Sequence, residues 1–218
     1  MMKRTLVVAM VGLLLSSSPA LATTVWTETF DTGVGKFDQT IGDGNLRFVW
    51  QSGGRIHGTF IRDGSNDRRY APLGESLDGN ADVFGFSVVV TPLASGGHAA
   101  SCIGLWNSVY DDPGYGANFL GVFVGGGSEG SSRWLTTKGR YADGGDCGSS
   151  SIIVFEYGTT YFFDVLLNGP LHLMSVSVFE GPDESGIFLG SLDTYLEPGR
   201  AIQFDSLGMG TPFPGSDQ

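Results

Sequence analysis

Short runs of alternating apolar and polar residues, each ended by Gly, Pro or an Asp-Gly pair, constrain this chain more than any other feature. In DVFGFSVVV, Phe84, Phe86 and Val88 share one face of an extended chain. In HLMSVSVFE, Met174 and Val176 alternate with serines in the same way. This period of two predicts strands with one buried face, and the frequent breakers leave no window long enough for a helix.

The alternating pattern recurs along most of the chain. We expect strands near residues 25–30, 45–51, 55–62, 67–73, 82–92, 99–108, 118–124, 133–138, 151–157, 161–168, 171–180, 186–192 and 202–208. Connections such as Asp43-Gly44 and Asn168-Gly169 supply the positive φ that tight hairpins require, which predicts antiparallel pairing.

About 12–13 antiparallel strands cannot lie in one open sheet without curling or splitting. The sequence therefore predicts an all-β fold, a two-sheet antiparallel β-sandwich (jelly roll), with a closed barrel as the competing arrangement. No fixed-length repeat stands out, which disfavours a propeller or a β-helix. We expect one domain over residues 23–210, followed by a C-terminal tail at 211–218.

The first 22 residues have the layout of a signal peptide. A basic MMKR precedes the apolar TLVVAMVGLLL, and Ala20-Leu21-Ala22 fits the small-residue site that signal peptidase cleaves, which predicts cleavage after Ala22. The alternative is a retained anchor, but the apolar run is shorter than the roughly 20 residues needed to span a bilayer. We therefore expect a secreted or periplasmic protein with no membrane span in the mature chain.

The charge balance excludes two classes of partner. The chain has 12 Lys and Arg against 23 Asp and Glu, a net charge of −11, and removing the leader would delete Lys3 and Arg4 as well. Such a surface repels phosphate backbones and anionic lipid, so we expect no nucleic-acid partner. The 26 aromatic residues, 15 Phe, 7 Tyr and 4 Trp, argue against a disordered chain.

Cys102 and Cys147 are the only cysteines. In an oxidising compartment, such a pair is expected to form one disulfide. The alternative is two unrelated thiols, with Cys102 buried in a strand and Cys147 in a loop. With only three histidines beside them, no zinc-binding cluster is expected.

Several segments resemble the secreted concanavalin A-like (laminin G-like) jelly rolls, of the bacterial type. They are the opening VWTETFDTGVGKF and GDGNLRFVW, the hairpin YFFDVLLNGPLHLMSVSVFEG and the closing IQFDSLGMG. The resemblance covers most of residues 25–210 in pattern. It implies a two-sheet jelly roll with a concave face for glycans or other ligands, and its members include lectins, carbohydrate-binding modules, glucanases and alginate lyases, so the fold alone does not select a function.

The resemblance also implies a structural calcium ion. Asp31 ends the first expected strand and Asp205 lies in the last, and these strands are often neighbours in such sandwiches. Two carboxylates with turn carbonyls and water would supply the oxygen ligands that calcium prefers. The alternative is that Asp31 caps its own turn and Asp205 is solvated.

Four residues are candidates for contact with a carbohydrate. His57 and Arg69 lie in the charged stretch RIHGTFIRDGSNDRRYAPL, where an Arg fork would suit an acidic sugar, unless the charges only pair at a solvated surface. Trp106 and Trp134 would offer flat plates to sugar rings, unless they are buried in the core.

Motifs for catalysis are missing from the sequence. Glucanases of this fold usually carry E-x-D-x-x-E on one strand and alginate lyases carry R-[ST]-E-[LV]-R and Q-[IV]-H, and the chain contains none of these strings. We therefore expect an exported, non-catalytic, lectin-like protein whose partner is an extracellular glycan or a cell-surface polymer. The alternatives are a lyase or hydrolase with atypical residues, and a structural or adhesive surface protein.

Overall fold

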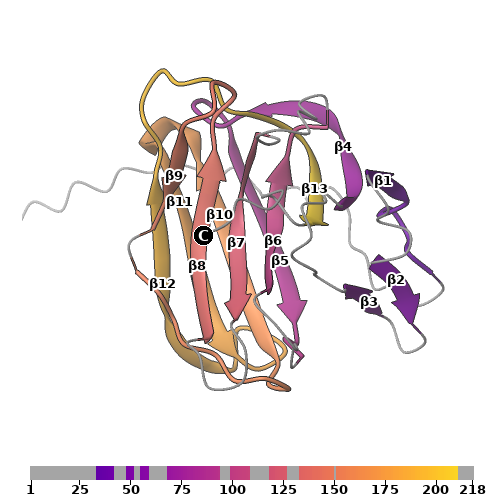
Figure 1. The fold of residues 1–218 in the computed structure, drawn as a ribbon. Helices are drawn as coiled ribbons and strands as arrows, with labels where there is room; N and C mark the ends of the chain where they lie inside the picture. The colour runs from indigo at the N-terminus through magenta and orange to yellow at the C-terminus, as the bar shows by residue number, and fades with distance from the viewer. Residues whose placement is uncertain are drawn as a thin grey trace, which may run out of the picture.

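The computed structural model describes residues 33–41, 48–51, 55–58, 68–93, 99–108, 118–126, 133–149 and 151–210. Strands make up nearly all of the regular structure in these ranges (Figure 1). They are β1 (Gln39–Ile41), β2 (Phe48–Gln51), β3 (Arg55–Gly58), β4 (Arg68–Asp78), β5 (Val83–Val90), β6 (Ala99–Trp106), β7 (Phe119–Gly126), β8 (Arg133–Arg140), β9 (Asp146–Gly148), β10 (Tyr161–Asn168), β11 (Leu173–Glu180), β12 (Ile187–Tyr195) and β13 (Gln203–Gly210).

The described strands form two main sheets. A seven-stranded sheet has the order β1-β4-β13-β6-β7-β8-β9, a four-stranded sheet has the order β12-β11-β10-β5, and β2 pairs with β3 in a separate ribbon. Every strand pair is antiparallel, from β1–β4 to β8–β9. The predicted all-β, two-sheet antiparallel sandwich is confirmed. No helix in the described ranges has the length and apolarity needed to cross a bilayer.

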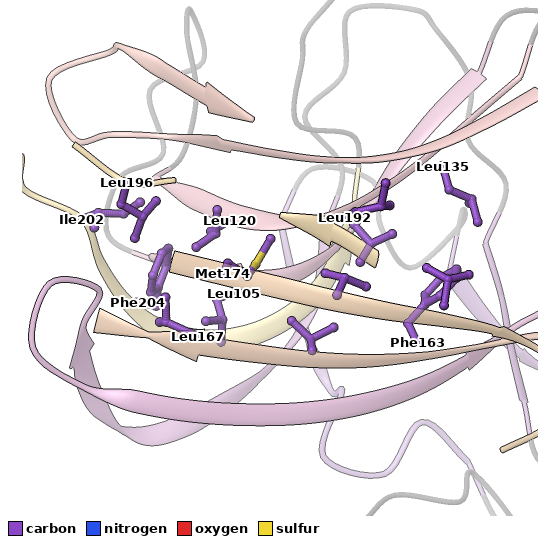
Figure 2. Close-up of a cluster of buried hydrophobic side chains, with 14 of the residues drawn as sticks. Leu105, Leu120, Leu135, Phe163, Leu167, Met174, Leu192, Leu196, Ile202 and Phe204 are labelled. Carbon is purple, nitrogen blue, oxygen red and sulfur yellow. The ribbon is translucent and has the colours of Figure 1, made fainter. Parts of the chain in front are cut away.

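The core lies between the two large sheets. Figure 2 shows Leu105, Leu120 and Leu135 of the seven-stranded sheet directed toward Phe163 and Met174 of the four-stranded one. Alternation along the strands produces this arrangement, because every second side chain turns inward. The faces predicted for β5 and β11 are confirmed: their inward side chains pack into this core, and those of β11 are fully buried.

A polar contact between side chains crosses this apolar core. Thr137 of β8 and Thr194 of β12 are both fully buried, and their hydroxyl oxygens lie 2.6 Å apart in a hydrogen bond. Burying the two hydroxyls costs less here because one donates a hydrogen bond to the other.

The outer face of the seven-stranded sheet, turned away from the four-stranded sheet, also contains buried residues. Cys102, Trp106, Phe119 and Phe123 form a second apolar cluster there. The ring centroids of Trp106 and Phe119 are 5.2 Å apart, and those of Phe119 and Phe123 are 5.8 Å apart. The middle of this sheet is therefore apolar on both faces.

Several local predictions differ from the structure. The short strands β1 and β9 were not predicted, because three residues are too few for a periodic signal. The expected strand at 151–157 reduces to one bridge, between Leu135 and Ile153. Asn168-Gly169 does not form a tight hairpin turn: Asn168 caps a 3₁₀ turn at Gly169–Leu171, and the positive φ falls on His172. The expected strand at 25–30 lies outside the described residues.

Candidate functional site

The register between β4 and β13 is interrupted at one point. Phe204 pairs with Leu77, but the next pair is Ser206 with Pro72. Residues 73–76 of β4 therefore lie opposite Asp205 alone. Gly74 within this segment has φ +85°, a conformation that glycine adopts at little cost. The extra residues form a large bulge, and bulges are over-represented next to active sites because they re-aim side chains.

A depression of about 440 Å³ opens at this bulge. Tyr70 and Pro72 alternate with the buried Ala71 and Leu73, so the depression opens on the outer face of the seven-stranded sheet. It is lined mainly by polar residues of β1, β4 and β13, with one from the connection that follows β6: Gln39, Tyr70, Pro72, Gly74, Glu75, Ser76, Ser108, Asp205 and Ser206.

Asp205 is held in place by Ser108. One carboxylate oxygen accepts the backbone N–H of Ser108 at 2.9 Å, and the other accepts its hydroxyl at 2.5 Å. A carboxylate has about four acceptor positions, so two such bonds leave it able to accept further hydrogen bonds from a ligand. Asp205 is thus a fixed acceptor within the depression.

The depression has an acidic character. Glu75 is exposed on the bulge and Asp205 is half-buried beside it, and among the described residues that line the depression none is Lys or Arg. Carboxylates accept strong, charge-assisted hydrogen bonds from hydroxyl groups. The same charges repel anions, so the arrangement suits a neutral polyol or a cation better than an acidic sugar.

Arg69 lies near this site in sequence but is directed to the other face of β4. Its side chain is buried, and its Nη1 donates to the carbonyl oxygen of Phe37 at 2.7 Å. Burial lowers the pKa of the guanidinium, and the nearby Asp38 opposes that shift. Arg69 therefore joins β4 to the segment before β1, and its buried guanidinium does not face a ligand.

The two candidate tryptophans differ in exposure. Trp106 faces opposite Leu105, as the alternation predicts, but its ring is only 1% exposed and the Arg68 guanidinium lies 5.0 Å from its centroid. Burial of this extent leaves no free ring face for a sugar. Trp134 is half-buried, with its indole over Gly125, where an added Cβ would fall 2.6 Å from Cε2.

The remaining predicted site residues are not brought together in the described ranges. Asp31 lies outside these ranges, and for His57 only the backbone, on β3 opposite Val49, is described. No group of three or more His, Cys, Asp or Glu in the described part of the chain is placed to hold a metal ion. The calcium site at Asp31 and Asp205 stays a prediction.

The predicted disulfide between Cys102 and Cys147 is wrong: both cysteines are free. The strand order places β7 and β8 between β6, which carries Cys102, and β9, which carries Cys147. With strands about 4.8 Å apart, the two Cα atoms are too far apart for a bridge. The thiols also lie on opposite faces, since Cys102 belongs to the outer cluster and Cys147 packs against the inner core.

We expect the native protein to react very slowly with a thiol reagent. Burial raises the pKa of Cys147 to about 11, although a hydrogen bond from Tyr141 opposes the shift, and burial also raises the pKa of Cys102 well above its usual value. The reactive thiolate of Cys147 is therefore scarce at pH 8, and its reaction rate should rise about tenfold per pH unit up to about pH 11. Absorbance of released thionitrobenzoate from Ellman's reagent measures this rate.

Denatured protein and a Cys147→Ser variant are the controls for this experiment. Both cysteines should react in denaturant without any reductant, and the slow native phase should disappear in the variant. No titratable thiol after denaturation would mean that the isolated protein is oxidised, contrary to the free cysteines of the structure.

Comparisons with known proteins identify no family for this chain. No protein-family model matches it, and no curated protein matches it. Among solved structures, it is similar to the crystal structure of the marine PL7 alginate lyase AlyA1 from Zobellia galactanivorans, with a TM-score of 0.34 and 13% sequence identity. The match covers 74% of this chain and 75% of that chain.

The sequence pattern indicates Asp205 as a candidate ligand but does not indicate its neighbours in the depression. Tyr70, Glu75 and Ser108 carry no motif, and the strand predicted at 67–73 ends just before the bulge. The one local signal is Gly74, since a glycine inside a longer strand often marks a bulge. Extending the predicted strand through Gly74 to Asp78 would have placed Glu75 on a strand, but its position beside Asp205 comes from the pairing of β4 with β13.

Proposed function

We propose that this protein is an exported, non-catalytic carbohydrate-binding sandwich of the concanavalin A-like type, and that it binds a neutral extracellular glycan in the depression at the β4–β13 bulge. The observation that carries the proposal is Asp205, a carboxylate fixed by Ser108 and set beside Glu75 in an open polar hollow. Paired sugar hydroxyls would donate to these carboxylates, and the ring of Tyr70 would pack against the sugar face.

The charge of the site supports a neutral ligand over a uronate. Glu75 and Asp205 have no basic residue beside them in the described part of the lining, and the whole chain carries a net charge of −11. The predicted partner for a carboxylate, Arg69, is buried and bonded to Phe37. A calcium ion at Asp205 remains part of the proposal and would come with further oxygen ligands.

The test is a binding titration with soluble neutral oligosaccharides and oligouronates, with and without calcium. Glu75→Gln should weaken binding of the neutral glycan about tenfold, because a charge-assisted hydrogen bond becomes a weaker neutral one. Asp205→Ala should weaken it at least as much. Glu184→Gln, an exposed carboxylate in the turn before β12, is the matched control and should leave the affinity unchanged.

Two results would refute this assignment. Tighter binding of oligouronates than of neutral glycans would contradict the charge argument. Neutral binding that neither Glu75→Gln nor Asp205→Ala weakens, with melting curves like that of the parent protein, would place the ligand elsewhere. Binding that requires added calcium and is lost with Asp205→Ala would support the metal as well as the site.

The second candidate function is glycoside hydrolysis, and one observation favours it. Two carboxylates line the same depression, and glycosidases use a carboxyl pair as acid and nucleophile or base. A reducing-end assay on the same oligosaccharides discriminates between the two functions. Sustained product release that Glu75→Gln abolishes would replace the binding function with catalysis.

A further inference from the structure

The outer face of the four-stranded sheet carries an apolar row across all four strands. Val89 of β5 pairs with Phe162 of β10, Phe162 with Phe179 of β11, and Phe179 with Phe188 of β12. We call these four residues the phenylalanine row. Neighbouring ring centroids are 6.1 Å apart for Phe162 and Phe179, and 5.3 Å apart for Phe179 and Phe188.

This row faces solvent. Phe188 is 57% exposed and Val89 51% exposed, and the two phenylalanines between them are half-buried. Directly behind the row, Phe163 and Val178 are fully buried in the core. Large apolar side chains gathered at solvent are uncommon, and such patches mark interaction sites.

A bulge in β12 directs Phe188 to this surface. The register of β11 with β12 shifts between Val178 and Phe179, so Val178 pairs with Gly190 and Phe179 with Phe188. Gly190 has φ +147°, a backbone conformation that residues other than glycine rarely adopt. Strict alternation from Ser191 would turn Phe188 inward, whereas the bulge turns it outward and sends Leu189 to the core.

The charged residues of the four strands that carry the phenylalanine row are all acidic. The strands β5, β10, β11 and β12 contain no Lys or Arg, but they carry Asp164, Glu180 and Asp193. Asp164 lies on the outer face two residues from Phe162, about 7 Å along the strand. It accepts a hydrogen bond from Ser87 at 3.2 Å, and Asp193 accepts one from Ser175 at 2.7 Å. The face therefore combines exposed rings with carboxylates that have no basic residue in their own sheet.

We propose that this face docks a basic, amphipathic polypeptide segment of a partner protein, with apolar side chains on the phenylalanine row and Lys or Arg at Asp164 and Asp193. Charge complementarity supports this occupant. A second copy of the chain would bring the same carboxylates, and an anionic membrane would also be repelled.

The ring geometry favours a polypeptide over a glycan. Phe162 and Phe179 are tilted by 54°, and so are Phe179 and Phe188. A sugar ring stacks on one flat, exposed ring face, and neighbouring rings tilted by 54° offer no common plane, whereas aromatic residues are enriched in the cores of protein–protein interfaces.

The test uses three fluorescein-labelled eight-residue peptides, with alternating Lys and Leu, Glu and Leu, or Lys and Ser. Fluorescence anisotropy should show saturable binding of the Lys–Leu peptide that weakens with added salt. Phe188→Ser should weaken it about tenfold, as expected for an apolar anchor. Asp164→Asn should weaken it about threefold, as for an exposed charge pair. The control is Ile152→Ser, which removes an apolar residue that is 60% exposed beside the other sheet and should change nothing.

Several outcomes would overturn the proposal. No saturable binding of the Lys–Leu peptide is one, and equal binding of either other peptide is another. Unchanged affinity in Phe188→Ser would remove the row from the interface. A dimer in sedimentation equilibrium that Phe188→Ser dissolves would identify a second copy as the occupant. Neutral-glycan binding that Phe188→Ser abolishes and Glu75→Gln leaves intact would make this face the glycan surface instead.

Discussion

Replacing Phe163 with Ala is expected to destabilise the protein by about 3–5 kcal/mol, the usual cost of deleting a buried aromatic ring. Phe163 is fully buried between the sheets, where Figure 2 shows it among the core side chains. The loss combines transfer of the ring to water with the cavity left in a close-packed interior. Urea unfolding followed by tryptophan fluorescence measures the change in free energy of unfolding.

Phe162→Ala is the matched control, because the same change is made one residue earlier on the same strand. Phe162 turns to the outer face and is only half-buried, so we expect a loss of about 1 kcal/mol or less. Equal losses for the two variants would mean that β10 does not have one face in the core, which would contradict the sandwich.

Gly104→Ala should be nearly as damaging, although it adds a single methyl group. A Cβ at Gly104 would press on the carbonyl oxygen of Leu120 and lie 2.5 Å from the Cα of Gly121. Both contacts are backbone atoms of the paired strand β7, so β6 and β7 would have to move apart. We expect a loss of about 3 kcal/mol, or a melting temperature lower by about 6–12 °C, by differential scanning calorimetry.

The same substitution at Gly85 provides the comparison. Gly85 lies on the exposed face of β5, and its added Cβ would meet the nearest atom, the carbonyl oxygen of Val165, at 3.4 Å. Ala restricts the unfolded chain and fits an extended strand, so stability should change by less than about 1 kcal/mol. A drop in Gly85→Ala as large as that in Gly104→Ala would show that strand glycines are needed for a reason other than close approach.

The parts of the fold that follow from local patterning could be predicted from the sequence. Alternation in β5 and β11 identified their inward faces, because burial of one face of a strand has a period of two in any context. The number of such strands required two layers. The short strands β1 and β9 form only because a longer neighbour offers them partners, and that information is not local.

The candidate site depends on pairing between segments far apart in the sequence. Asp205 was identified as a possible ligand, but Glu75 and Ser108 reach it only through the register of β13 with β4 and β6. The disulfide prediction was wrong for the same reason, since it used the compartment and the count of cysteines without the strand order that separates them. Trp106 is buried although it lies on the outer face, because a second apolar cluster forms there.

The hydrogen bond between Thr137 and Thr194 has a consequence for how the two layers are aligned. Leucine and phenylalanine contacts are non-directional, so they hold two sheets at a given separation while tolerating small offsets. A hydroxyl pair at 2.6 Å stays bonded only over offsets of a few tenths of an ångström, and a larger slip leaves two buried polar atoms without this partner. Together with the bond from the Glu197 N–H to the Tyr141 hydroxyl at the same end of the sheets, this contact favours one sliding position for the layers, and with it the relative placement of the depression and the phenylalanine row on opposite sides of the molecule.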